Sequence, residues 1–233
     1  MPRHAQSEVR PGVIDCNTLK PMNEFDAQLE NLALTPAQAW RKLREGNSRF
    51  VSDRTDHPNQ DALRRHSLIN SQYPFAVIFG CSDSRLAAEI IFDLGLGDVF
   101  VVRTAGHVID AAALGSLEYS VDLLNVPLIV VLGHDSCGAV TATIRSVETG
   151  HMPPGFIRDL VEHITPSVIA ANRNGIHDVN TTVVEHVQQT THRLVEQSRL
   201  ISKAVDEGRT AVIGVTYRLA EGKAEMVSGF GVL

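Results

Sequence analysis

The chain is poor in cysteine, tryptophan and long apolar runs. Its 233 residues include three cysteines and one tryptophan, and aromatic residues make up 5%. So few cysteines exclude a disulfide scaffold and indicate a reducing compartment. No apolar run is long enough for a membrane span, and the N-terminus lacks the apolar core of a secretory signal. We therefore expect a cytoplasmic protein with no membrane partner.

Positive charge is also scarce. Lys and Arg number 21 against 27 Asp and Glu, which gives a formal net charge of −6. Because nucleic-acid-binding proteins carry a basic surface, we expect no nucleic-acid partner. Apolar residues make up 43% of the chain and charged residues 21%, as in ordinary globular domains. The length fits one domain with a full core, together with an arm.

The predicted domain begins at residue 35. Residues 1–34 are polar, contain three prolines and show weak periodicity, so we expect an N-terminal arm, partly disordered. Cys16 lies in this arm and is expected to be a free thiol without a catalytic role. Thr35 and Pro36 then supply an N-cap and a first-turn proline for a helix. We assign residues 35–233 to the domain.

Strand and helix patterns alternate along this domain. Core strands are predicted at 75–81, 99–103, 127–132 and 210–217, with an edge strand at 222–227. Helices are predicted at 35–50, 62–69, 86–92, 110–124, 136–148, 156–164 and 180–207. The alternation predicts an α/β fold with a mostly parallel central β-sheet, flanked by helices and preceded by an N-terminal helical arm.

Two short polar segments follow two of the predicted strands. Cys81-Ser82-Asp83-Ser84-Arg85 follows the first strand, and Gly133-His134-Asp135-Ser136-Cys137-Gly138 follows the third. In an open parallel sheet, ligands bind outside the carboxyl ends of the strands. We therefore expect the side chains of the two segments to meet in a site at that edge.

Two cysteines and a histidine are a set of zinc ligands. Three protein ligands leave a fourth position for water or substrate, which is typical of catalytic rather than structural zinc. Taken alone, Cys81 fits a buried small apolar residue equally well, and His134 fits a hydrogen-bonded interior histidine. The joint pattern of Cys81, His134 and Cys137, with Asp83 and Arg85 beside one thiol, favours the metal site.

These motifs resemble those of the β-class carbonic anhydrases. The resemblance rests on Cys81-x-Asp83-x-Arg85, on His134-x-x-Cys137-Gly138, and on Arg103-Thr104-Ala105-Gly106-His107, which is similar to an Arg-Asn-Ala-Gly-Asn segment of that family. It runs from about Thr35 to the C-terminus, and residues 101–110 are similar to actinobacterial members. It implies reversible hydration of CO₂ to bicarbonate and a proton, by attack of zinc-bound hydroxide, with Zn²⁺ as the cofactor.

The resemblance also implies roles for the residues around the metal. Asp83, paired with Arg85, orients the hydroxide in one state, whereas in a closed state Asp83 replaces the water as fourth zinc ligand. The alternative for this pair is an ordinary surface ion pair, worth roughly 0–1 kcal/mol. A substrate pocket of the plant type is implied for Gln72, Phe100 and Tyr119, together with the backbone amide of Gly138.

Some positions depart from the family pattern or have a structural interpretation. Ile78 stands where the bicarbonate-regulated branch carries tryptophan, so we expect a site that is open at rest. His107 replaces an asparagine and is expected to be structural rather than a proton carrier. Asp135 could orient a neighbouring group or cap the helix that follows, and the cap is the expected role. Because two thiolates cancel the charge of Zn²⁺, activity should rise toward alkaline pH.

The family's pocket lies at a dimer interface, with an N-terminal helix wrapped over the partner subunit. The amphipathic segment 35–50 is compatible with that arrangement, so we expect a dimer or a dimer of dimers. Two other functions would use the same ligands. One is a zinc or redox-sensing domain whose thiols respond to oxidants, and the other is a hydrolase of CS₂ or COS.

Overall fold

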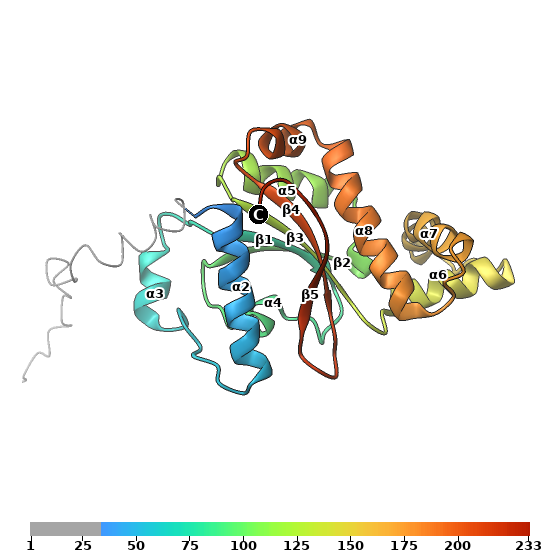
Figure 1. Ribbon diagram of the computed structural model, residues 1–233, viewed down its shortest axis with the longest axis horizontal. Coiled ribbons are helices and arrows are strands. Elements are labelled where there is room, and N and C mark those ends of the chain that lie inside the picture. The colour runs from blue at the N-terminus through green and yellow to red at the C-terminus, as the bar shows by residue number, and fades with distance from the viewer. Residues whose placement is uncertain (1–33) are drawn as a thin grey trace, which may run out of the picture.

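A five-stranded sheet forms the centre of the computed structural model, which describes residues 34–233 (Figure 1). The strands are β1 (Ala76–Cys81), β2 (Val99–Thr104), β3 (Leu128–His134), β4 (Ala211–Tyr217) and β5 (Ala224–Phe230). They lie in the order β2-β1-β3-β4-β5; the first four are parallel and β5 is antiparallel to β4. The predicted α/β fold is confirmed. Residues 1–33, with most of the predicted arm and Cys16, lie outside the described residues.

The three inner strands are buried along their whole length. Strands of a parallel sheet that are covered on both faces read as continuous apolar runs, and this is why β1, β3 and β4 were visible in the sequence. The two edge strands, β2 and β5, are only partly buried. The sheet therefore has a dry centre and two accessible edges.

Helices cover both faces of the sheet (Figure 1). They are α2 (Pro36–Val51), α3 (Ala62–Ser67), α4 (Ala88–Ile91), α5 (Ala111–Asp122), α6 (Gly138–Thr149), α7 (Ile157–Arg173), α8 (Val179–Gln197) and α9 (Arg199–Asp206), with a 3-10 turn, η2 (Ala105–His107). Helix α8 packs on β3, β4 and β5, and α5 packs on β1 and β2, whereas α2 and α4 pack against each other on the other face. Helices α6 and α7 pack on each other beside α8.

Helix α2, the first within the described residues, begins where the sequence predicts. The Thr35 hydroxyl accepts a hydrogen bond from the Gln38 N–H, and the Gln38 side chain accepts one from the Thr35 N–H. This reciprocal capping box satisfies two donors that a helix start leaves without partners. Pro36 occupies the first turn, where its missing N–H costs nothing. Trp40 and Leu43 then bury one face of α2 in the core.

Two predicted helices have different bounds in the structure. The single helix predicted over 180–207 is two helices, because Ser198 has an extended backbone (φ −104°, ψ 112°) and its hydroxyl caps α9 at the Ile201 N–H. The apolar stripe continues across this break, so periodicity alone did not reveal it. The helix predicted over 156–164 extends to Arg173 through Pro166. Burial of Val168 on the far side of the proline accompanies this extension.

The strand order reverses at β1, which pairs with β2 on one side and with β3 on the other. Such a switch point opens a crevice beyond the carboxyl ends of the two strands, where α/β proteins bind ligands. Register pairs Gly80 of β1 with Leu132 of β3, so Cys81 ends its strand close to the level at which His134 ends the next. The fold thus brings both polar segments to one place.

Candidate metal centre

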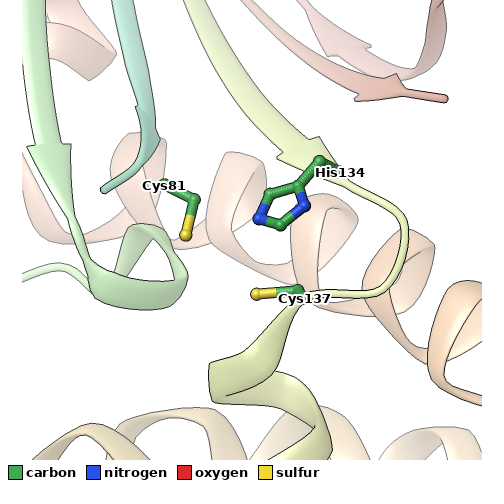
Figure 2. Close-up of side chains that lie close together, drawn as sticks. All are labelled: Cys81, His134 and Cys137. Carbon is green, nitrogen blue, oxygen red and sulfur yellow. The ribbon is translucent and has the colours of Figure 1, made fainter. Parts of the chain in front are cut away.

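Three buried side chains converge at the switch point (Figure 2). Cys81 comes from the end of β1, His134 from the end of β3, and Cys137 from the residue before α6. One ligand atom from each lies within 4.8 Å of the other two. Two sulfurs and one imidazole nitrogen at this spacing could hold a metal ion, and such a set of three ligands is typical of catalytic zinc.

The hydrogen bonding of His134 fits a metal ligand. Its Nδ1 lies 2.8 Å from the carbonyl oxygen of Asp135, which can only accept, so Nδ1 carries the proton. The other nitrogen, Nε2, then has a free lone pair; it is buried and has no hydrogen-bond partner among the described residues. A buried nitrogen without a partner is costly unless a ligand satisfies it, so this donor set fits zinc.

The two thiols have opposite pKa shifts in the metal-free chain. A hydrogen bond from the Cys137 thiol lowers the pKa of Cys81, with a further contribution from the Gly106 N–H, which lies 3.2 Å from the Cys81 sulfur. The same contact with Cys81 raises the pKa of Cys137, and burial adds to it. One thiolate is therefore already stabilised by the protein, and thiolate is the form that binds metals.

Asp83 and Arg85 lie at the open side of this centre. Arg85 Nε and Nη2 donate to the two carboxylate oxygens of Asp83 at 2.9 and 2.8 Å. This two-point contact holds the pKa of Asp83 well below its usual range. The carboxylate oxygen Oδ2 lies 3.9 Å from Nε2 of His134. An ionised carboxylate is thus held beside the place where a metal would sit.

Arg103 fixes the backbone that carries Cys81 and Asp83. Its Nε donates to the carbonyl of Cys81 at 3.0 Å, and its Nη2 to the carbonyl of Asp83 at 2.7 Å. The sequence includes Arg103 in a family motif but contains no local signal for this long-range contact. The loop after β1 is therefore held from the neighbouring strand β2.

The predicted helix cap by Asp135 is wrong. Helix α6 begins after Cys137 with no side-chain cap. The carboxylate of Asp135 instead accepts a hydrogen bond from the Leu219 N–H at 3.1 Å, and its own N–H donates to the Tyr217 carbonyl. Asp135 therefore ties the loop after β3 to the end of β4, because a partner distant in sequence competes with the local helix start.

The residues predicted for the substrate pocket lie in three different places in the single chain, with Phe100 and Tyr119 together. The rings of Phe100 and Tyr119 stack with centroids 6.0 Å apart, and Tyr119 is 43% exposed. Gln72 lines a cavity of about 520 Å³ beside Leu96, whereas Gly138 lines one of about 700 Å³ along α6. The pocket assignment therefore stays a prediction.

Two buried histidines lie behind the metal ligands. His107 packs edge-on against Phe79 and lies 4.4 Å, ring centroid to ring centroid, from His186 of α8. Burial lowers the pKa of both, to about 4 for His186. The structural interpretation of His107 fits this dry position. No sequence signal pointed to His186, because this residue stands in a polar helix and most histidines of the described residues are exposed.

Comparisons with known proteins agree with this geometry. A family model described as carbonic anhydrase matches residues 76–224, which include all three ligands. The chain is 52% identical over 196 residues to a carbonic anhydrase of Mycolicibacterium smegmatis, with 84% of this chain and 95% of that one covered. Carbonic anhydrase 2 of Mycobacterium tuberculosis is 53% identical with the same coverage. The chain belongs to the β-carbonic anhydrase family. It is therefore an enzyme of the carbonic anhydrase class, as the sequence predicts.

Solved structures of β-carbonic anhydrases share the fold. The enzyme CcaA superposes with a TM-score of 0.64 at 21% identity, covering 91% of this chain and 93% of that one. A tetrameric β-carbonic anhydrase of Sordaria macrospora also gives 0.64 at 21% identity, covering 90% and 100%. Over the described residues, no helix is both long and apolar enough to cross a membrane.

Proposed function

We propose that this β-carbonic anhydrase hydrates CO₂ reversibly to bicarbonate and a proton at a zinc ion held by Cys81, His134 and Cys137. The observation that carries the proposal is the convergence of these three buried ligands beside an arginine-held carboxylate. When bound, zinc would supply a hydroxide nucleophile by lowering the pKa of a water. Two thiolates and a neutral imidazole also balance its charge, which suits an uncharged substrate.

The protein's own part begins with orientation of the ligands. The Asp135 carbonyl holds the His134 ring with its bare Nε2 toward the thiols. The Gly106 N–H donates to Cys81 and thereby steadies the sulfur. Both contacts hold the proposed ligand atoms, Nε2 of His134 and the sulfur of Cys81, through backbone groups that do not titrate near neutral pH. Contacts from outside the ligand set thus support the geometry that metal binding needs.

Asp83 acts as a hydrogen-bond acceptor for the attacking water or hydroxide. Because Arg85 keeps Asp83 ionised, the carboxylate can accept a hydrogen bond from the attacking water or hydroxide. This hydrogen bond turns the lone pair of the attacking oxygen toward the substrate. Arg85 also competes with the metal for the same two oxygens. We propose that the bidentate pair corresponds to an open resting site, and that Asp83 becomes a fourth ligand only when Arg85 lets go.

The substrate pocket is completed by self-association. We propose that Gln72, Phe100 and Tyr119 face the open ligand position of a partner subunit in a dimer or a dimer of dimers. The exposed rim of Tyr119 and the accessible edge strand β2 support this arrangement. Two buried free thiols also suit a reducing, cytoplasmic location. Analytical ultracentrifugation tests the assembly, and a monomer that retains full activity would contradict it.

Stopped-flow CO₂ hydration on zinc-loaded protein at pH 8.5 tests the reaction itself. We expect rapid hydration that is lost on chelation, restored by zinc, and rising from pH 6 to 9. His134→Ala should abolish it, whereas His192→Ala, at an exposed histidine of α8, should not. Absence of hydration with zinc shown to be bound would reject the proposal in favour of a sensor or a CS₂ or COS hydrolase.

A further inference from the structure

Gly106 joins a metal ligand to a buried histidine. Its N–H donates to the sulfur of Cys81 at 3.2 Å, and its carbonyl oxygen lies 2.9 Å from Nε2 of His186. The two contacts sit on opposite sides of one residue. A single imidazole on α8 is thereby connected, through one backbone residue, to a thiolate at the end of β1.

This connection matters because Gly106 cannot hold its own position. Its backbone is left-handed (φ 67°, ψ 23°), and glycine enters many other backbone conformations at little cost. A larger residue is excluded, since a Cβ here would lie 2.8 Å from the Ile164 side chain and 2.9 Å from that of Ala139. The direction of the Gly106 N–H must therefore be fixed by contacts with other residues, and the hydrogen bond with His186 is such a contact.

His186 is itself held on three sides. Because a carbonyl only accepts, the Nε2 that faces Gly106 carries the proton. Burial lowers the pKa of His186 to about 4, so the ring is neutral near pH 7. Its Nδ1 lies 2.9 Å from the Ser167 hydroxyl, whose one proton is shared with Oε1 of Gln189 at 3.0 Å. The ring of His107 packs against its face. These contacts select one tautomer and one ring orientation.

We propose that His186 is a positioning residue of the metal centre, holding Gly106 so that its N–H donates to the Cys81 thiolate. The proposal rests on the zinc site argued above. A hydrogen bond to a ligating sulfur orients its lone pairs and stabilises the thiolate, and loss of such outer contacts typically lowers metal affinity about 10- to 100-fold. His186 touches neither substrate nor metal, so its effect passes entirely through Gly106.

Two amide substitutions separate the contact made by Nε2 of His186 from the contact made by its Nδ1. In His186→Gln the side-chain amide reaches the place of Nε2 and can still donate to Gly106, whereas in His186→Asn it reaches only to the place of Nδ1 and keeps the Ser167 side. His192→Asn, at an exposed position of the same helix, is the matched control. Zinc affinity is measured by competition with a chromophoric chelator, and the sulfur-to-metal absorption band is recorded on cobalt-substituted protein.

We expect His186→Asn to bind zinc about 10- to 100-fold more weakly and to shift the cobalt band. His186→Gln should stay within a few-fold of the wild type, and His192→Asn should match it. Equal affinity and equal spectra for both His186 variants would overturn the proposal, as would losses that follow only their melting temperatures. Wild-type protein that binds no zinc would reject the metal site as well, so the two failures are distinguishable.

Discussion

Two arginine–aspartate pairs in this fold join the same two side-chain types but differ in their surroundings. Asp93 of the first pair is 1% exposed and accepts from Arg49 at 2.6 Å and from the backbone N–H groups of Asp56 and His57 at 2.9 and 3.0 Å. Asp83 of the second is 19% exposed and Arg85 is 51% exposed. Among residues 34–233, the hydrogen bonds to its carboxylate come from the Arg85 guanidinium and the Arg85 N–H.

The difference fits a structural role for the Arg49–Asp93 pair and the proposed catalytic role for the Arg85–Asp83 pair. Every contact of Asp93 goes to protein that it ties together, α2 and the loop after it. Asp83 instead presents one oxygen to the metal ligands, 3.9 Å from Nε2 of His134. A pair whose hydrogen-bonding capacity is spent inside the fold contributes to folding, and a pair that leaves capacity directed at an open site is available for catalysis.

The largest effect is expected from Asp83→Asn. Loss of the carboxylate removes the acceptor that orients the attacking group, so kcat/KM for CO₂ hydration should fall by about 10²- to 10⁴-fold. The melting temperature should stay near that of the wild type, because Arg85 is 51% exposed and water replaces its lost partner. Stopped-flow kinetics and calorimetry measure both quantities. Activity within twofold of the wild type would assign Asp83 to the surface-pair alternative.

Asp93→Asn should give the opposite pattern. Removing one partner of a buried pair typically costs 3–5 kcal/mol, and we expect about 3 kcal/mol here because Arg49 is partly exposed. Urea denaturation measures this loss, and kcat per folded molecule should not change. A stable variant with impaired hydration would mean that the contrast between the two pairs is false.

A smaller effect is expected from Arg85→Lys. Lysine keeps the charge but loses the two-point geometry, so Asp83 should be oriented less well and kcat/KM should fall about tenfold. The matched variant Arg49→Lys should lower stability by about 1 kcal/mol and leave the kinetics alone. Full activity in Arg85→Lys would show that charge alone suffices.

The smallest effect concerns acid stability. Burial works against ionisation of Asp93, but the Asp56 N–H and Arg49 outweigh it and lower its pKa below the ordinary 3.8. A carboxyl with a lowered pKa stabilises the fold fully above its ordinary value and loses that contribution as pH falls through the folded value. The stability gap between wild type and Asp93→Asn should therefore narrow below about pH 4 in denaturation curves. A gap independent of pH would exclude this account.

Much of the fold was predictable because buried segments consist of apolar residues, which are visible in the sequence. Strands β1, β3 and β4 are continuous apolar runs, and two of the candidate metal ligands, Cys81 and His134, are the last residues of β1 and β3. The contacts that were missed join residues far apart in sequence, such as Asp135 with Leu219 and His186 with Gly106. Ser198 ended a helix without interrupting the apolar stripe. Periodicity shows which face is buried, but not which distant atom a polar group will meet.

The ligands of this centre come from two stretches of chain that only sheet formation unites. His134 and Cys137 are near neighbours in any conformation, whereas Cys81 joins them when β1 pairs with β3. An unfolded chain therefore offers a weak chelate of two residues. Binding of the proposed zinc by all three ligands requires β1 and β3 to pair. The time at which refolding protein begins to retain zinc against a mild chelator would thus report when β1 and β3 pair.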